Sequence, residues 1–212
     1  YKKYYCNNME LKYNNKLTIL HVTNWFPTKN EPHKGKWIYS QISSIHDYFN
    51  NEIVHIEVIS GNLNYKKRKI SNMINSYILK FPYKKWFINE ILTTLMFIII
   101  VYKRHKINNY CLLNIHIAYP LLTYFKCFKY FFNIPIVINE HWSAYHFKFN
   151  LTNEKKINKI SEIFKNDIPI ITVSKALMID INNFCGISNN FHIVPNAINT
   201  EIFYNYNHCF FL

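Results

Sequence analysis

Ile168 to Phe203 reads IPIITVSKALMIDINNFCGISNNFHIVPNAINTEIF, and this stretch decides the fold. It opens with a run rich in β-branched residues, 168–173, which is typical of a strand buried on both faces of a parallel sheet. Ser174 is placed to cap a helix and Cys185-Gly186 to end it. Phe191 to Val194 then supplies a second strand, which completes the strand, crossover helix and strand from which parallel sheets are built. The expected apolar stripe of the helix is Ala176, Leu177, Ile179, Ile181 and Phe184.

The rest of the chain repeats this alternation of strands and helices. Short apolar runs predict buried strands, and longer segments between them predict helices. The expected fold class is therefore α/β, a doubly wound parallel sheet in a single Rossmann-like domain. His55 and Glu57 are expected to point to solvent, because side chains alternate along a strand. The predicted strands are Leu17–Val22, Ile53–Ile59, Leu112–Ile117 and Ile134–Asn139, and the predicted helices are Trp37–Phe49, Trp86–Tyr102, Asn153–Phe164 and a segment from Pro120 to about Phe131.

Composition excludes several classes of protein. Of 212 residues, 50% are hydrophobic and 17% are charged, which excludes a disordered chain and leaves enough apolar side chains for a full core. Only 3 glycines are present. Neither G-x-G-x-x-G nor G-x-x-x-x-G-K-[ST] can be written, which argues against a Rossmann oxidoreductase or any glycine-rich phosphate loop. No set of His, Cys, Asp or Glu has metal-site spacing, so neither a metal ion nor a cofactor is expected.

The cysteines bear on the cellular compartment. Five are present, at positions 6, 111, 127, 185 and 209, and none forms a C-x-x-C pair. Reduced thiols of a cytosolic protein fit this odd set better than a disulfide framework or a zinc site. Residues 1–16 are polar and charged, unlike a signal peptide. We therefore expect a cytoplasmic protein, peripheral on the inner membrane face if its basic segment binds lipid.

The positive charge is concentrated in one segment. The formal net charge is +13, and between Lys66 and Lys106 only Glu90 opposes a series of Lys and Arg residues. These cations flank Trp86–Tyr102, whose uninterrupted apolar part is too short for a spanning helix of roughly 20 residues. One interpretation is a helix that inserts an apolar face into an anionic membrane surface. The alternatives are a buried core helix and a lysine-rich composition without a partner. Nucleic acid is not expected, because no helix-turn-helix, zinc-finger or ribonucleoprotein signature accompanies the charge.

Three stretches between Leu17 and Phe203 carry a family resemblance. One is VSKALMIDI followed by FHIVPNAINTEIF, one is a strand ending in HV followed by NWFP and KG, and one contains NIHIAYP and IPIVINEHWSAY. In this combination they resemble the N-terminal domain of family 4-type retaining glycosyltransferases, which have the two-Rossmann-domain GT-B architecture. Ala197 stands where that family commonly has glycine, and Asn199 where it commonly has aspartate.

The resemblance implies a function and a division of labour. Such enzymes transfer a sugar from a nucleotide-sugar to an acceptor, here a cell-surface polysaccharide or glycolipid, with retention of anomeric configuration. A second Rossmann domain binds most of the nucleotide-sugar. Residues 1–16 are expected to be a polar extension, 17–203 the acceptor-side domain, and 204–212 a tail that does not supply the second domain. The chain is thus expected to be inactive without a separate donor domain. The alternative is a non-catalytic membrane-surface or partner-binding module of the same fold.

Ligands of a doubly wound sheet bind outside the carboxyl ends of the strands. His116 is the predicted catalytic residue, because an imidazole can hydrogen-bond a sugar hydroxyl or a phosphate and change charge near neutral pH. The alternative is a ring satisfied by backbone carbonyls. Glu140 is expected to orient an acceptor hydroxyl or to pair with a basic neighbour. His141 is expected to contact donor phosphate, unless the two residues form a structural corner. The predicted substrate-binding residues are Asn24, Gly35, Glu140, His141, Ser174 and Asn196, and no metal ligand is predicted.

Two of these residues have specific alternatives. The resemblance places the loop 23–35 beneath the donor diphosphate, where Gly35 would let the backbone approach the ligand. The alternative is a surface loop that only packs Trp25 and Phe26. Ser174 fits a helix cap better than a ligand contact.

Overall fold

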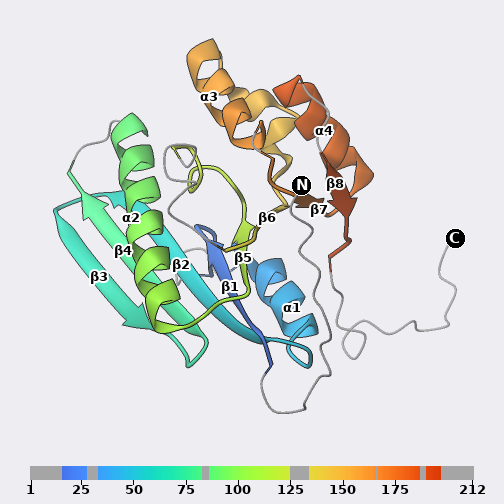
Figure 1. Cartoon of the computed structure of the whole chain (residues 1–212). Helices are drawn as coiled ribbons and strands as arrows, with labels where there is room; N and C mark the ends of the chain where they lie inside the picture. Colours follow the sequence, from blue (N-terminus) through green and yellow to red (C-terminus); the bar gives the residue numbers. More distant parts are fainter. Residues whose placement is uncertain are drawn as a thin grey trace, which may run out of the picture.

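The computed structural model describes residues 16–27, 33–82, 86–124, 134–165, 167–186 and 190–196. Strands and helices alternate along most of this part of the chain (Figure 1). The strands are β1 (Thr18–Thr23), β2 (Asn50–Ser60), β3 (Asn64–Lys69), β4 (Ile74–Phe81), β5 (Leu112–His116), β6 (Ile136–Glu140), β7 (Ile170–Thr172) and β8 (Phe191–Ile193). The helices are α1 (Lys36–Ser44), α2 (Trp86–Ile107), α3 (Glu154–Phe164) and α4 (Lys175–Cys185), with short 3-10 turns η3 (Ser143–Tyr145) and η4 (Lys148–Asn150).

All the described strands belong to one sheet, in the order β3-β4-β2-β1-β5-β6-β7-β8. The pairs from β4 to β8 are parallel, and only β3 runs antiparallel, against β4. The order grows outward from β1 in both directions, which is the doubly wound arrangement expected from the sequence. The predicted fold class is confirmed.

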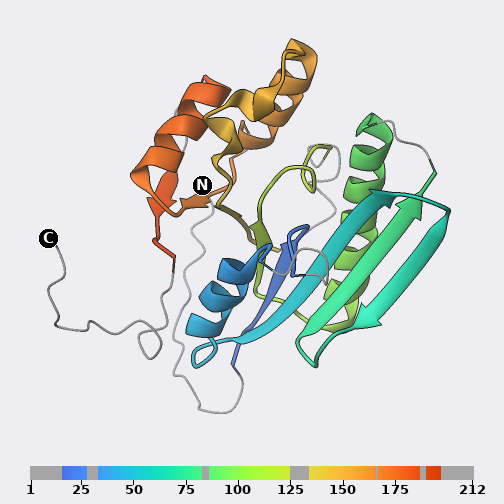
Figure 2. The ribbon, with the colours of Figure 1, turned by 180° about the vertical axis from the view of Figure 1, so that it is seen from behind.

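Helices cover both faces of the sheet. α2 crosses one face and α1 lies on the opposite face, as the views from front and back show (Figures 1 and 2). On the α2 side, Phe97 packs into a core with Leu20 and other buried strand residues. On the α1 side, a smaller cluster joins Ile38 and Ile42 to Ile53. Because side chains alternate along each strand, the residues between these apolar positions face α1, and several of them are polar.

The caps of the last two helices follow the sequence closely. The Ser174 side chain accepts a hydrogen bond from the amide of Leu177 at 3.1 Å, and Gly186 ends α4 in the left-handed conformation with φ 66°. Asn153 caps α3 through its side chain in the same way. The predicted stripe of α4 is wrong at Ile179, which is 45% exposed.

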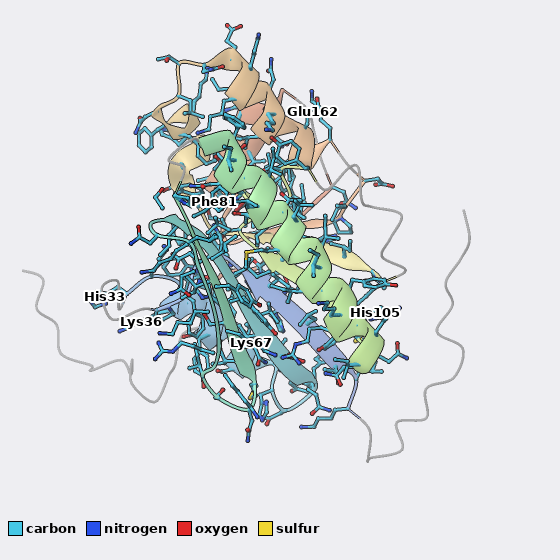
Figure 3. All side chains as sticks on the ribbon, turned by 90° about the vertical axis from the view of Figure 1, so that its left-hand side faces the viewer. His33, Lys36, Lys67, Phe81, His105 and Glu162 are labelled. Carbon is cyan, nitrogen blue, oxygen red and sulfur yellow. The ribbon has the colours of Figure 1, made fainter. Side chains whose placement is uncertain are left out.

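A β-hairpin that the sequence did not predict ends the sheet. In the sequence, β3 and β4 lie between the predicted strand at 53–59 and the predicted helix at 86–102, and Figure 3 labels Lys67 of β3. Every residue of β3 is exposed. A wholly exposed strand lacks the alternation of apolar and polar residues that marks a half-buried strand. Its lysines therefore indicated only a basic cluster.

Other predictions differ in their boundaries or burial. β2 is longer than predicted, and His55 within it does not face solvent: it is 2% exposed and its Nδ1 lies 2.9 Å from Ser76 Oγ. α1 ends at Ser44, earlier than predicted, and the chain turns there. The helix predicted from Pro120 to about Phe131 falls mostly outside the described residues.

α2 has one buried and one exposed face. Phe97 and Val101 are fully buried. The outer face carries a row of large, partly exposed apolar side chains, so the core-helix alternative holds for one face of α2 only. Within the described part of the chain, no helix is both long and apolar enough to cross a membrane. The exposed row is Phe87, Ile91, Leu95, Ile99 and Tyr102, each 38–50% exposed.

Candidate functional site

Three neighbouring strands end at the same edge of the sheet. The register places Thr23 of β1 beside His116 of β5, and His116 beside Asn139 of β6. Because parallel strands point the same way, the residues that follow them meet at one rim. His116, Glu140 and His141 therefore come together there, as the sequence predicted.

A hydrogen-bonded row of polar side chains supports His116 on the α1 face of the sheet. Asn51 donates from Nδ2 to the carbonyl oxygen of Phe49 at 3.1 Å, which turns its Oδ1 toward His21. Oδ1 then accepts from Nε2 of His21 at 3.0 Å, so His21 Nδ1 is the acceptor for Nε2 of His116 at 3.1 Å. Both rings carry their proton on Nε2. Nδ1 of His116 is left with a lone pair and has no hydrogen-bond partner among the described residues.

Burial keeps these imidazoles neutral. Desolvation lowers the pKa of His21 to about 4, partly opposed by its hydrogen bond to Asn51. Desolvation, and then the neighbouring His21 and His141, hold the pKa of His116 well below its usual value. The expectation that His116 changes charge near neutral pH is therefore wrong. The alternative of a ring satisfied by backbone carbonyls is also wrong at Nε2, whose partner is His21. The choice of His116 as catalytic residue stays a prediction.

His141 stacks on the ring of His116 and is less buried. The two rings stack with centroids 5.9 Å apart and planes 23° apart, and His141 is only partly buried. Burial lowers the pKa of His141 to about 4, opposed by the nearby Asn196 side chain. Both ring nitrogens are buried, and neither has hydrogen-bond geometry to a described partner. A neutral imidazole can donate from one nitrogen and accept at the other.

Gln41 of α1 ties Asn196 to the rim. Its Oε1 accepts from Asn139 Nδ2 at 3.1 Å, and its Nε2 donates to Asn196 Oδ1 at 3.1 Å. The Gln41 side chain thus connects the end of β6 to the segment after β8, which lies more than 50 positions later in the sequence. Asn196 is placed at the rim as predicted, and it is exposed.

Glu140 is turned inward. It is 0% exposed, and its carboxylate accepts from the amides of Ala118 at 3.1 Å and His141 at 3.0 Å and from the Tyr145 hydroxyl at 2.6 Å. Burial raises the pKa of Glu140 to about 7, although these hydrogen bonds oppose the shift. A buried carboxylate engaged by two backbone amides and a tyrosine hydroxyl matches the structural-corner alternative. It joins the loop after β5 to the loop after β6, and so fixes the rim.

Gly35 lies against backbone of the chain itself, and its predicted contact with a ligand stays a prediction. Its φ is 71°, and a Cβ on Gly35 would lie 2.6 Å from the carbonyl oxygen of Trp25. The backbone that approaches this glycine is therefore that of the loop after β1. The ring of Trp25 in turn contacts Trp37 and Trp142, with centroids 5.8 and 5.2 Å away. The Phe26 ring packs against His55 with centroids 5.6 Å apart, so the packing of Trp25 and Phe26 named in the loop alternative is present.

The remaining two predicted residues have local roles. Ser174 is engaged as the cap of α4. Asn24 follows β1, and its Oδ1 is buried without a partner among the described residues. No described contact joins either side chain to the histidines.

Sequence reasoning missed three supporting residues: His21, Asn51 and Gln41. His21 interrupts an otherwise apolar strand, and a polar residue inside a buried strand is a signal in itself, because burial without a partner is costly. Asn51 gave no such signal, because it lies between Asn50 and Glu52 at the polar start of β2. Gln41 gave no such signal, since it lies on the polar side of an amphipathic segment. Among the described residues, no group of three or more His, Cys, Asp or Glu is placed to hold a metal ion.

The chain therefore has a Rossmann-like α/β fold with a polar rim. Comparisons with solved structures support this fold. The sequence matches no protein family and no curated protein. Among solved structures, sucrose-phosphate synthase from Thermosynechococcus elongatus has a TM-score of 0.56 at 13% identity, over 89% of this chain and 50% of that one. Another structure of that synthase gives 0.52 at 12% identity, over 87% of this chain and 92% of that one. An α,α-trehalose-phosphate synthase from Burkholderia vietnamiensis gives 0.46 at 10% identity, over 85% and 49%.

These likenesses concern the fold. The chain spans about half the length of the first synthase, as one Rossmann-like half of a GT-B glycosyltransferase would. At such low identity the activity does not follow from the fold, and it has to be argued from the rim.

Proposed function

We propose that this chain is the acceptor-side half of a retaining glycosyltransferase of the family 4 type, which moves a sugar from a nucleotide-sugar to a polysaccharide or glycolipid. The observation that carries the proposal is the convergence at one rim of His116, His141 and the Trp25 loop, held by Glu140 and Gln41. Binding sites occur at this edge in open α/β sheets.

The chemistry of the rim fits uncharged hydroxyl groups. His141 supplies a neutral imidazole for a sugar hydroxyl or a donor phosphate oxygen, although both of its nitrogens are buried in the unliganded chain, and the His116 ring stacks against it. The indole of Trp142 beside them offers an apolar face for the C–H side of a sugar ring. The donor nucleotide would be bound mainly by a second Rossmann domain, which residues 17–203 do not include.

A complementation assay tests this proposal. The purified chain is incubated with labelled nucleotide-sugars and membrane glycolipid extracts, alone and with a separately produced donor-type Rossmann half. We expect transfer only in the mixture, and its loss in His141→Ala. A control variant is Tyr39→Ala, since that exposed residue lies on the outer side of α1. Robust transfer by the isolated chain would contradict the division into halves.

A second candidate function, binding to an anionic membrane surface through 66–106, is favoured by the outer face of α2. Every exposed side chain described on α2 up to Tyr102 is large and mainly apolar. The solvent-facing side of an ordinary surface helix is polar, so this face favours contact with an apolar partner. Basic side chains lie close to this face: Lys103 and Lys106 follow on α2, and Lys67 of β3 extends over the ring of Tyr77, which belongs to the core beneath α2. An apolar strip bordered by cations matches the acyl and headgroup layers of an anionic bilayer.

Vesicle sedimentation tests the membrane contact. We expect binding to phosphatidylglycerol vesicles that weakens with salt, and little binding to phosphatidylcholine. Ile99→Glu should weaken it about tenfold or more through lost apolar burial. Lys67→Glu should weaken it as well, since each basic residue near the surface contributes about 1 kcal/mol. The matched control Tyr39→Glu adds the same charge to α1 on the opposite face and should have no effect. Binding that ignores lipid charge and salt would refute the contact.

The two candidates can be told apart. A non-catalytic membrane module would bind vesicles through α2, but it would bind no glycan and would not support transfer with any donor half.

A further inference from the structure

A pocket opens at the rim next to the histidines. It has a volume of about 460 Å³, within the range of ligand sites. Loops after β5 and β6, the turn η4 and the first turn of α3 form its walls. Trp142 connects it to the predicted site, since this residue follows His141 and its ring contacts Trp25. The lining residues are Tyr119, Trp142, Ser143, Ala144, Phe147, Phe149, Asn150, Leu151 and Lys156.

The aromatic walls of the pocket are held in place. Phe149 meets Trp142 edge to face at 4.8 Å and Tyr145 at 4.9 Å. The hydroxyl of Tyr119 donates to Glu90 of α2 at 2.5 Å. Phe147 differs from these rings, because it is 63% exposed and leaves most of its surface open. The pocket thus combines fixed rings with one accessible ring.

The turn beside the pocket has an unusual backbone. Lys148, Phe149 and Asn150 adopt φ values of 47°, 56° and 52°, so three successive residues other than glycine are left-handed. This conformation is unfavourable for L-residues and is found mainly where function requires it. The turn brings Phe149 and Asn150 to the pocket wall together.

The charge of the pocket is positive. Among the lining residues that the structure describes, Lys156 carries a positive charge and none is acidic. Ser143 and Asn150 add a hydroxyl and an amide that can hydrogen-bond hydroxyl groups. A ligand that matches needs an apolar ring face, hydroxyl groups at its edge and a negative substituent.

We propose that this pocket binds the acceptor as a pyranose ring that bears an anionic group, a phosphate or a carboxylate. The ring lies against Phe147 and Trp142, and the anionic group faces Lys156. The inference rests on the proposed function, in which this half of the enzyme holds the acceptor, and it adds the chemical class of that acceptor.

Calorimetric titration of the whole chain tests the pocket directly. The probes are methyl glucoside, glucose 6-phosphate, glucuronic acid, inorganic phosphate and uridine. We expect both anionic sugars to bind more tightly than methyl glucoside, phosphate or uridine. Which of the two binds better distinguishes a phosphorylated from an acidic acceptor.

Variants locate the binding. Phe147→Ala should weaken binding of the anionic sugars about five- to tenfold, through the lost ring contact. Lys156→Gln should reduce their affinity to that of methyl glucoside. Because Phe147 is largely exposed, its truncation leaves the core intact, and Tyr48→Ala is a matched control at another exposed aromatic side chain.

Each outcome decides between the proposals. Anionic sugar binding that both variants weaken supports the pocket, even if no donor half restores transfer. Affinity for phosphate equal to that for the anionic sugars, tighter binding of uridine, or unchanged binding in both variants overturns it. If complementation succeeds while both variants bind and transfer normally, the proposed function stands and the pocket is wrong.

Discussion

Substitution of Gly35 by alanine tests how the loop after β1 is fixed. Two costs add in Gly35→Ala. The left-handed conformation, φ 71°, costs an L-residue about 1 kcal/mol. The new Cβ also falls 2.6 Å from the Trp25 oxygen and 3.0 Å from its carbonyl carbon, so backbone has to move, and overpacking of this kind costs about 1–3 kcal/mol. The free energy of unfolding should fall by about 2–4 kcal/mol.

Gly186→Ala is the matched control. Its φ is 66°, nearly that of Gly35, but a Cβ there meets nothing within 4 Å. It should therefore lose only the conformational part, about 1 kcal/mol. The difference between the two variants isolates the contact with Trp25.

The measurement is urea unfolding followed by circular dichroism, with near-ultraviolet dichroism of the folded state. In a chain of this length, a further loss of about 2 kcal/mol corresponds to a melting temperature lower by about 4–8 °C. Gly35→Ala alone should also change the near-ultraviolet signal, because Trp25 packs against Trp37 and Trp142. Equal losses in both variants, with an unchanged signal, would refute this account of the loop.

Three further predictions concern stability. Arg104→Met should cost about 3 kcal/mol by urea unfolding, because it leaves the buried Glu52 carboxylate without its ion pair at 2.5 Å, whereas Lys103→Met should be nearly neutral. Ser174→Ala should cost about 1 kcal/mol by removing the cap of α4, and a loss below about 0.3 kcal/mol would show that the cap is dispensable. The raised pKa of Glu140, about 7, means that its contribution is complete at low pH and declines as pH rises from about 4.5 through 7. Relative to the wild type, Glu140→Gln should therefore become more stable by about 2.5 kcal/mol between pH 5 and pH 8, and a flat difference across this range would contradict the raised pKa.

The parallel part of the fold followed from the sequence because its strands are buried. Runs such as Leu17–Val22 and Leu112–Ile117 are apolar on both faces, since helices cover both sides of the sheet. Burial of both faces also explains why His55 was wrongly expected to face solvent. Alternating side chains point to solvent and core in turn only when one face of the sheet is open. β3 could not be predicted, because a wholly exposed strand has no apolar pattern.

The candidate site was predictable in its location and less so in its chemistry. His116 lies near the end of one predicted strand, and Glu140 and His141 follow another, so topology alone placed them at one rim. The neutral state of His116 depends on His21 and Asn51, which lie 95 and 65 residues away in sequence. Their contact is set by the register of β1 against β2 and β5, which no local pattern reveals.

The position of β3 at the end of the sheet has a practical consequence. An outermost strand presents unpaired backbone groups that can recruit another chain, and closely spaced lysines discourage such pairing. Lys66, Lys67, Arg68 and Lys69 occupy this border, so they act as a barrier to self-assembly whatever else they bind. Neutral substitutions there would remove the barrier and could produce fibrils or precipitates that sediment with vesicles. Reversal to glutamate removes the attraction to anionic lipid and preserves the barrier.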